Sequence, residues 1–290
     1  MESASRREAC PFDGKRVTGV EVVRDGKLEQ FQAGCEVVLS LGAIQTPKIL
    51  MQSGIGDSGQ LRSFGIGVIQ HLPGVGANLQ EHVLLAGCVW EYARPDQSRG
   101  ACGDATFLAK SDPALATPDL QAFVANGPFL SAELSGQAPA GPAWSITPGL
   151  VRPQSRGQVR LTGAKHTDPV DINLNILSQG ADLRATMECV RLCREVGNGA
   201  AFRSLTKREA CPGPVGDVEL EAFVRNAAVP FWHYGQDGPG RPVGRGWQSS
   251  RLWHRRPARC GRLDHAECDY RQHHGALRDH RRALRRDTEG

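Results

Sequence analysis

The chain of 290 residues lacks several features that would place it in a common protein class. No stretch approaches the ~18 consecutive apolar residues that a membrane-spanning helix requires, and the N-terminal stretch MESASRREACPFDG has no apolar signal core. None of the nine cysteines forms a CxxC pair. These absences predict a protein with no membrane span, a cytoplasmic location and free thiols.

The N-terminal part has the patterns of a strand pair followed by a buried strand and a helix. Residues 17–24 alternate as a strand and lead into the tight-turn pair Asp25-Gly26 and a partner strand. The apolar run at 36–40 is typical of a strand buried on both faces. Thr46-Pro47 then predicts a helix start, with Thr46 as N-cap and proline in the first turn.

From about Val83 the pattern changes to short strand-like runs separated by loops rich in proline, glycine and alanine, which indicates a second, sheet-rich unit. Residues 181–198 predict an amphipathic helix, and residues 217–233 predict another that Pro230 stops. The expected apolar stripe of the first helix comprises Leu183, Met187, Val190, Leu192 and Val196. Cys189 and Cys193 have a spacing that could bridge a metal, but we interpret them as small buried side chains and expect no metal site.

Glycines gather where strands end and helices begin, at positions 42, 54, 56, 74 and 76. A glycine lets backbone approach a ligand closely, and a helix N-terminus favours an anionic group such as a pyrophosphate. Spacing alone leaves the ordinary alternative open, in which these glycines only reverse the chain.

Two longer strings are more specific. EVVLSLGAIQTPKILMQSGIG, followed by LPGVGANLQEH, closely resembles the second signature region of the glucose–methanol–choline (GMC) oxidoreductases, which are FAD-dependent alcohol oxidases and dehydrogenases. RPQSRGQVRLTG, DINLNILS and AAVPFWH resemble the substrate domain of that family. The resemblance covers roughly residues 12–234.

The resemblance implies FAD as cofactor and assigns residues to it. Backbone after Ser40 would pass beside the flavin nucleotide, and the turn around Asn78 would lie close to the flavin. For His82, a structural hydrogen-bonding role is the alternative to cofactor contact. The expected cofactor-binding residues are Ser40, Gly42, Ala43, Thr46, Asn78 and His82. Leu41 and Glu81 depart from the family, which commonly has alanine and aspartate at these positions.

His233 is the expected catalytic residue, because it stands at the position of the family's active-site histidine. Oxidation of an alcohol needs a base for the hydroxyl proton, and an imidazole titrates near neutrality. The flavin supplies the redox chemistry. The expected substrate is a small-molecule alcohol.

The resemblance implies an α/β (α+β) fold with two domains, and a third segment, residues 235–290, follows them. Residues 1–82 would be a partial FAD-binding, Rossmann-like domain, and residues 83–234 a substrate domain with an antiparallel sheet and flanking helices. The start of the chain lacks the GxGxxG turn of a dinucleotide site, so we expect a fragment that binds FAD weakly or not at all and does not turn over.

Residues 235–290 are rich in arginine, contain no lysine and show no apolar periodicity. Their codons could be read one nucleotide later to give strings such as Ala-Lys-Met-Gly-Arg and Val-Thr-Thr-Gly-Asn, which resemble the family's C-terminus. Our hypothesis is a frameshift after His233 that leaves a disordered, out-of-frame tail. The alternatives are a product of a decayed coding sequence and, ranked third, a basic nucleic-acid-binding arm, for which no recognition motif is visible.

Overall fold

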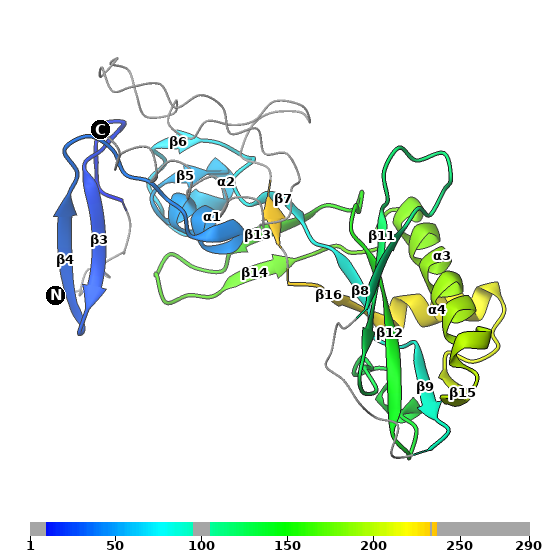
Figure 1. The fold of residues 1–290 in the computed structure, drawn as a ribbon. Helices are drawn as coiled ribbons and strands as arrows, with labels where there is room; N and C mark the ends of the chain where they lie inside the picture. The colour runs from blue at the N-terminus through cyan, green and yellow to red at the C-terminus, as the bar shows by residue number, and fades with distance from the viewer. Residues whose placement is uncertain (1–9, 95–104, 233, 237–290) are drawn as a thin grey trace, which may run out of the picture. The chain divides into compact units, whose positions relative to one another are not determined.

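The structure is a computed structural model that describes residues 10–94, 105–232 and 234–236. These residues form a mixed α/β fold in which antiparallel sheets are combined with helices, as the sequence predicts (Figure 1). The hypotheses for the tail fall almost entirely on residues 237–290, which lie outside the described residues.

The N-terminal strand pair is confirmed. After the short strands β1 (Phe12–Asp13) and β2 (Arg16–Val17), β3 (Gly19–Arg24) pairs with β4 (Lys27–Gln32) in an antiparallel hairpin. Asp25 and Gly26 both have positive φ, at 52° and 75°. That conformation is the one that a two-residue Asp-Gly turn favours, because its twist matches the flanking strands.

The predicted strand at 36–40 is wrong. This segment has no regular secondary structure, and Val38 is 75% exposed. A continuous apolar run is stable as a strand only where neighbouring strands cover it on both sides, and no strand within the described part of the chain pairs with it. The apolar run at 36–40 therefore favours burial, but the described residues do not bury it.

The helix that follows is α1 (Gly42–Gln52), and it begins five residues before the predicted start at Pro47. Thr46 is not its N-cap, and Pro47 lies inside the helix. Its end at Ser53 and Gly54 agrees with the sequence pattern. Beyond it, the two-residue strand β5 (Ile55–Gly56) pairs in parallel with β6 (Gln70–His71), and the short helix α2 (Ser58–Ser63) connects them.

A four-stranded sheet joins distant parts of the sequence. Its strand order is β14 (Val170–Asn173), β13 (Gly157–Leu161), β7 (Ala77–Gln80) and β17 (Gly235–Gln236). β13 and β14 thus share a sheet with β7, although they lie after the proposed boundary at residue 82. The boundary stays a prediction, and this sheet crosses it.

The second sheet has seven strands. β10 (Thr106–Ala109), β11 (Leu120–Ala125), β12 (Ala143–Leu150), β8 (Val83–Leu85) and β16 (Ala228–Pro230) follow one another, while β9 (Val89–Tyr92) pairs with both β12 and β15 (Thr206–Cys211). All its pairings are antiparallel. This arrangement confirms the predicted antiparallel sheet.

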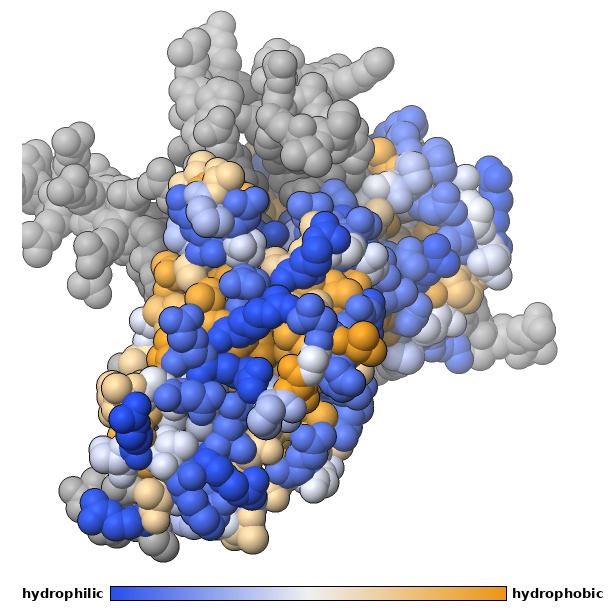
Figure 2. All heavy atoms as spheres, turned by 90° about the vertical axis from the view of Figure 1, so that its right-hand side faces the viewer, coloured by the Kyte–Doolittle hydropathy of each residue, from blue (hydrophilic) through white to orange (hydrophobic). Residues whose placement is uncertain are grey.

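Helices α3 (Gly180–Gly197) and α4 (Asp217–Ala227) contact this sheet (Figure 1). Short 3-10 turns occupy Ser135–Gln137 and Ala200–Phe202. α4 ends three residues before Pro230, so that proline does not stop it. On α3 the predicted stripe is partly wrong, because Val196 is exposed. Figure 2 views the side on which these helices lie and shows bands of hydrophilic side chains with hydrophobic ones visible between them.

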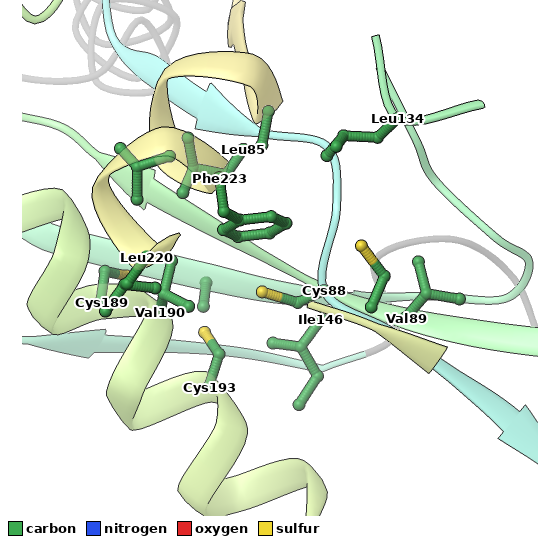
Figure 3. Packing of buried hydrophobic residues seen from close by; sticks show 14 of the residues in the cluster. Leu85, Cys88, Val89, Leu134, Ile146, Cys189, Val190, Cys193, Leu220 and Phe223 are labelled. Atoms are coloured by element: carbon green, nitrogen blue, oxygen red, sulfur yellow. The ribbon is translucent and has the colours of Figure 1, made fainter. Parts of the chain in front are cut away.

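The hydrophobic core lies between the seven-stranded sheet and the two helices. Figure 3 shows Cys88, Cys189 and Cys193 packed among apolar side chains such as Ile146 and Phe223. All three cysteines are fully buried and free, which confirms the interpretation of Cys189 and Cys193 as small core residues. Burial raises the pKa of Cys88 well above its ordinary value, so this thiol stays protonated and behaves as an apolar group.

Candidate functional site

The first group of predicted site residues lies at the start of α1. Ser40 and Gly42 are exposed, and Gly42 has a φ of 78°. A Cβ atom added to Gly42 would meet no other atom within 4 Å, so open space borders this backbone. The first N–H groups of a helix have no partner within the helix, and they therefore face this accessible region with partial positive charge.

Thr46 has a different role from the predicted one. Its Oγ1 accepts a hydrogen bond from the backbone N–H of Leu41 at 3.1 Å, one turn back along the chain. This bond holds the residue that precedes the helix and so fixes the conformation in which Gly42 and Ala43 begin α1. Thr46 therefore shapes the exposed backbone, which is an indirect contribution to any ligand site there.

α1 is held in place from its other side by the loop between β13 and β14. Lys48 donates a hydrogen bond through Nζ to the backbone oxygen of His166, and Gln52 donates through Nε2 to that of Lys165, both at 2.7 Å. Met51 and Gln52 are buried. These contacts fix the position of α1, and with it the position of its exposed start.

Three other glycines of the cluster, Gly54, Gly56 and Gly76, serve packing. A Cβ on Gly54 would lie 2.4 Å from the backbone oxygen of Gly67, and one on Gly76 would lie 2.2 Å from that of Val159. A Cβ on Gly56 would lie 3.0 Å from the Met51 side chain. These three glycines allow chain segments to touch each other, so only Gly42 remains suited to ligand approach among these four.

Asn78 lies at a β-bulge in β7. Leu79 is opposite Gly157 and Ala77 is opposite Gln158, so Asn78 is the extra residue between the two pairs, and its φ is 64°. A bulge re-aims a side chain away from the regular alternation of the strand. A left-handed backbone outside glycine is uncommon and gathers at functional positions.

His82 lies in the two-residue link between β7 and β8 and is half-buried. Its imidazole ring meets the ring of Phe231 edge-on, with centroids 5.9 Å apart and an interplanar angle of 90°. Phe231 belongs to the stretch AAVPFWH, so this contact connects the second glycine-rich turn with the segment of the predicted catalytic histidine.

His233 itself lies outside the described residues, but the chain on both sides of it is described. β16 pairs with β8 so that Pro230 is opposite Val83. β17 pairs with β7 so that Gly235 is opposite Gln80. Residues 230 and 235, on the two sides of His233, therefore lie opposite residues 83 and 80.

Two further residues, Tyr234 and Glu81, lie close to each other near the chain that flanks His233, and the sequence did not single them out as site residues. Burial raises the pKa of the Tyr234 phenol, and the Glu81 carboxylate raises it further. Glu81 is only 3% exposed. The sequence signal for Glu81 was present, because it stands where the family has an aspartate, but a carboxylate in a loop-like string gives no sign of burial.

The structure thus brings Asn78, His82 and the two sides of His233 together. Ser40, Gly42, Ala43 and Thr46 form a separate group at the start of α1. β13 links the two groups, because it contacts α1 and pairs with β7.

The residues present fit part of an FAD site. The open space at Gly42 is what a nucleotide lying against the backbone requires, and the start of an eleven-residue helix favours an anionic group. The backbone from Ser40 to Ala43 and the re-aimed Asn78 would hold the cofactor. Leu41, a departure from the family, is 51% exposed.

A further depression of about 640 Å³ lies between α2, the turn at 73–77 and β13. It contains none of the predicted site residues. Among the residues that the structure describes, no group of three or more histidine, cysteine, aspartate and glutamate side chains is placed to bind a metal ion. No helix in this described part is both long and apolar enough to cross a bilayer.

Comparison with known proteins gives consistent results. Two sequence models of the family described as GMC oxidoreductase match residues 10–84 and 153–235, together more than half of the chain. These limits agree with the predicted extent of the resemblance, residues 12–234.

Relatives and solved structures agree with this match. Mitochondrial choline dehydrogenase of Mus musculus is 31% identical over 250 residues, covering 77% of this chain and 41% of the relative. Oxygen-dependent choline dehydrogenase of Rhizobium johnstonii is 32% identical over 247 residues, covering 75% and 44%. Pyridoxine 4-oxidase from "Mesorbium loti" superposes with a TM-score of 0.72 at 28% identity, covering 79% of this chain and 45% of that one.

The formate oxidase of Aspergillus oryzae shares the fold, with a TM-score of 0.69 at 22% identity over 78% of this chain and 49% of the other. The chain therefore spans about half or less of the length of the relatives and structures that it matches. The signature strings, the two family matches and the fold lead to one conclusion: this chain belongs to the GMC oxidoreductase family, whose members are FAD-binding flavoproteins.

Proposed function

We propose that this chain takes part in the FAD-dependent oxidation of a CH–OH group in a small-molecule alcohol, and that it supplies the alcohol side of the active site together with part of the flavin site. The family supports this proposal. Its relatives are named for the dehydrogenation of choline and the oxidation of pyridoxine, and both activities are consistent with an alcohol substrate.

The roles of the residues follow from their positions. FAD, when bound, accepts the hydride. The backbone of Ser40, Gly42 and Ala43 would lie against the nucleotide, and Asn78 would point toward it from the bulge. His233 would take the hydroxyl proton, because an imidazole is half-ionised near neutral pH.

Glu81, which is buried near Tyr234, would contribute to that proton transfer. Burial raises the pKa of Tyr234, the residue that follows His233, and the Glu81 carboxylate raises it further. A nearby carboxylate favours the protonated imidazole. Glu81 would thereby stabilise His233 after His233 has accepted the proton.

The observation that carries the proposal is the double strand pairing on either side of His233. β16 against β8 and β17 against β7 place residues 230 and 235 next to residues 83 and 80. Without these pairings, the expected base and the expected flavin-side turn would be unrelated in space.

The first test measures FAD binding by the quenching of flavin fluorescence during titration of the full chain. We expect weak, saturable binding that Gly42→Leu weakens by tenfold or more, because the side chain would fill the space beside the backbone. Gly26→Leu is the matched control, since Gly26 has a similar φ of 75° and the same open surroundings. Absent binding, or equal effects of both variants, would contradict the flavin part of the proposal.

The second test concerns His233. Protein saturated with FAD is mixed anaerobically with an alcohol, and bleaching of the flavin absorbance reports hydride transfer. His233→Asn should abolish any bleaching and leave the FAD affinity unchanged. Bleaching that survives in the variant would remove His233 from the proposed role.

A further inference from the structure

An aromatic cluster lies beside the segment of the predicted base. The ring of Phe231 meets that of Phe123 at a centroid distance of 6.0 Å and an angle of 60°, in addition to its edge-on contact with His82. All three side chains are half-buried. A half-buried ring keeps part of its apolar surface accessible.

These rings lie on the face of the seven-stranded sheet that α3 and α4 do not cover. Along β11, Leu120 and Ala122 point into the core against the helices, so the alternation of a strand directs Phe123 to the opposite face. A Cβ added to Gly149 would lie 3.3 Å from the Phe231 ring. Phe231 therefore covers a position of β12 that has no side chain.

The same face carries no charge across its central strands. Phe123 is opposite Thr106 on one side and Thr147 on the other, and Gly149 is opposite Gln121 and Leu84. The strands β10, β11, β12, β8 and β16 contain no charged residue at all. A charged ligand that binds here would lose water and gain no opposite charge from these strands.

We propose that Phe123 and Phe231 form the surface that binds the apolar body of the alcohol, and that the site selects an uncharged alcohol with a flat aromatic group over a quaternary ammonium alcohol such as choline. This inference rests on the proposed function and deepens it. Because both side chains are uncharged aromatic rings, apolar contact and edge-to-face ring packing favour an aryl alcohol.

A cationic alcohol would also be attracted by aromatic rings, but phenylalanine is a weaker partner for a cation than tryptophan. Such a site also gains from an accessible carboxylate. Glu81, the acidic residue of this region, is nearly completely covered by protein, so it cannot pair with the ammonium group of a bound ligand. Both points favour the neutral substrate.

The test is a binding measurement that needs neither flavin nor turnover. The full chain is titrated with 4-fluorobenzyl alcohol, with fluorine NMR line broadening as readout, and with choline in parallel by competition. We expect binding of the aryl alcohol at least tenfold tighter than that of choline. Phe123→Ala should weaken it about tenfold, and Phe123→Leu should have an intermediate effect because apolar area remains.

Phe31→Ala is the matched control. Phe31 is an exposed phenylalanine in another sheet, on β4, and its removal should leave the affinity unchanged. Circular dichroism melting of each variant reports whether the fold is retained. Equal affinity for both alcohols, or equal loss in Phe31→Ala and Phe123→Ala, would overturn the inference.

The outcome separates the two proposals. Selective aryl alcohol binding without flavin binding would support this surface and count against the proposed oxidoreductase function. Flavin that is bound and bleached by choline, with no binding of the aryl alcohol, would support the oxidoreductase function and overturn the aromatic preference.

Discussion

The carboxylate of Asp182 ties the start of α3 to the loop between β12 and β13, and its removal should be severely destabilising. Asp182 is 2% exposed and accepts hydrogen bonds from the backbone N–H groups of Gln154 and Ser155, both at 2.7 Å. It also accepts one from the hydroxyl of Ser155 at 2.5 Å. This loop connects the seven-stranded sheet to the four-stranded one, so its position affects both halves of the candidate site.

The magnitude follows from these three bonds. Asp182→Ala leaves three donors without their acceptor, two of them on the buried Ser155, and each unsatisfied buried donor costs about 1–3 kcal/mol, reduced where water can enter. We expect a loss of about 3–5 kcal/mol in the free energy of unfolding, the range for removing a buried charged partner. Because whole domains are stable by only about 5–15 kcal/mol, the variant should be close to unfolding. Asp182→Asn keeps one acceptor oxygen and should lose roughly half as much.

Urea denaturation followed by tryptophan fluorescence measures this loss. Trp90 and Trp144 stack in the core with ring centroids 4.8 Å apart and report its unfolding. The matched control is Asp217→Ala, which removes another first-turn aspartate, on α4, with a side chain 83% exposed in an ion pair with Arg191. It should cost about 1 kcal/mol or less. Equal losses in the two alanine variants would refute the reasoning.

Three further predictions concern packing, thiol reactivity and pH. Gly76→Ala should lower the free energy of unfolding by about 3 kcal/mol or more in the same assay, because its φ is 81° and the new Cβ would overlap a backbone oxygen; wild-type stability would contradict this. Iodoacetamide should label the exposed Cys35 much faster than Cys211, since burial raises the pKa of the Cys211 thiol to about 11; equal rates in peptide mass spectrometry would contradict it. The hydrogen bond from Lys207 lowers the pKa of Glu91, so its carboxylate stabilises the fold above its ordinary pKa and loses this contribution as the pH falls through the lowered value. Glu91→Gln should therefore lower the Tm at neutral pH and leave it unchanged in strong acid, and a difference that grows on acidification would contradict this.

The parts of the fold that the sequence predicted correctly depend on neighbouring residues. The hairpin around Asp25-Gly26 and the helix α3 are set by turn chemistry and by the spacing of apolar residues, and both are present. The buried Cys189 follows from the same spacing.

The errors concern interactions between distant segments. The run at 36–40 has the composition of a central strand, but its structure depends on neighbours that no local pattern contains. Thr46 has the sequence of an N-cap, yet its hydroxyl is used to hold the backbone of Leu41. Val196 continues the apolar period of α3 but is exposed, whereas the neighbouring Gly197 is the residue that packs against Trp90 of the sheet.

The candidate site shows the same limit. The family signature gave the identities of Asn78, His82 and His233, whereas the pairing of the chain on both sides of position 233 with β8 and β7 follows from the register of two ladders. Residue 230 is opposite residue 83, and residue 235 is opposite residue 80. Four residues, 231 to 234, must therefore fit opposite only two, 81 and 82.

The excess chain cannot continue the ladder and must bulge out of it. The backbone of Trp232 shows this directly, with a φ of 60° and a side chain that is 64% exposed. A bulky residue in a left-handed conformation costs energy that the pairings on both sides must supply. The two short strands β16 and β17 are thus required on either side of the site, since loss of either would let the segment relax into regular pairing or leave the sheet. The two sides of position 233 would then no longer lie against β7 and β8, although every residue of the family signature would still be present.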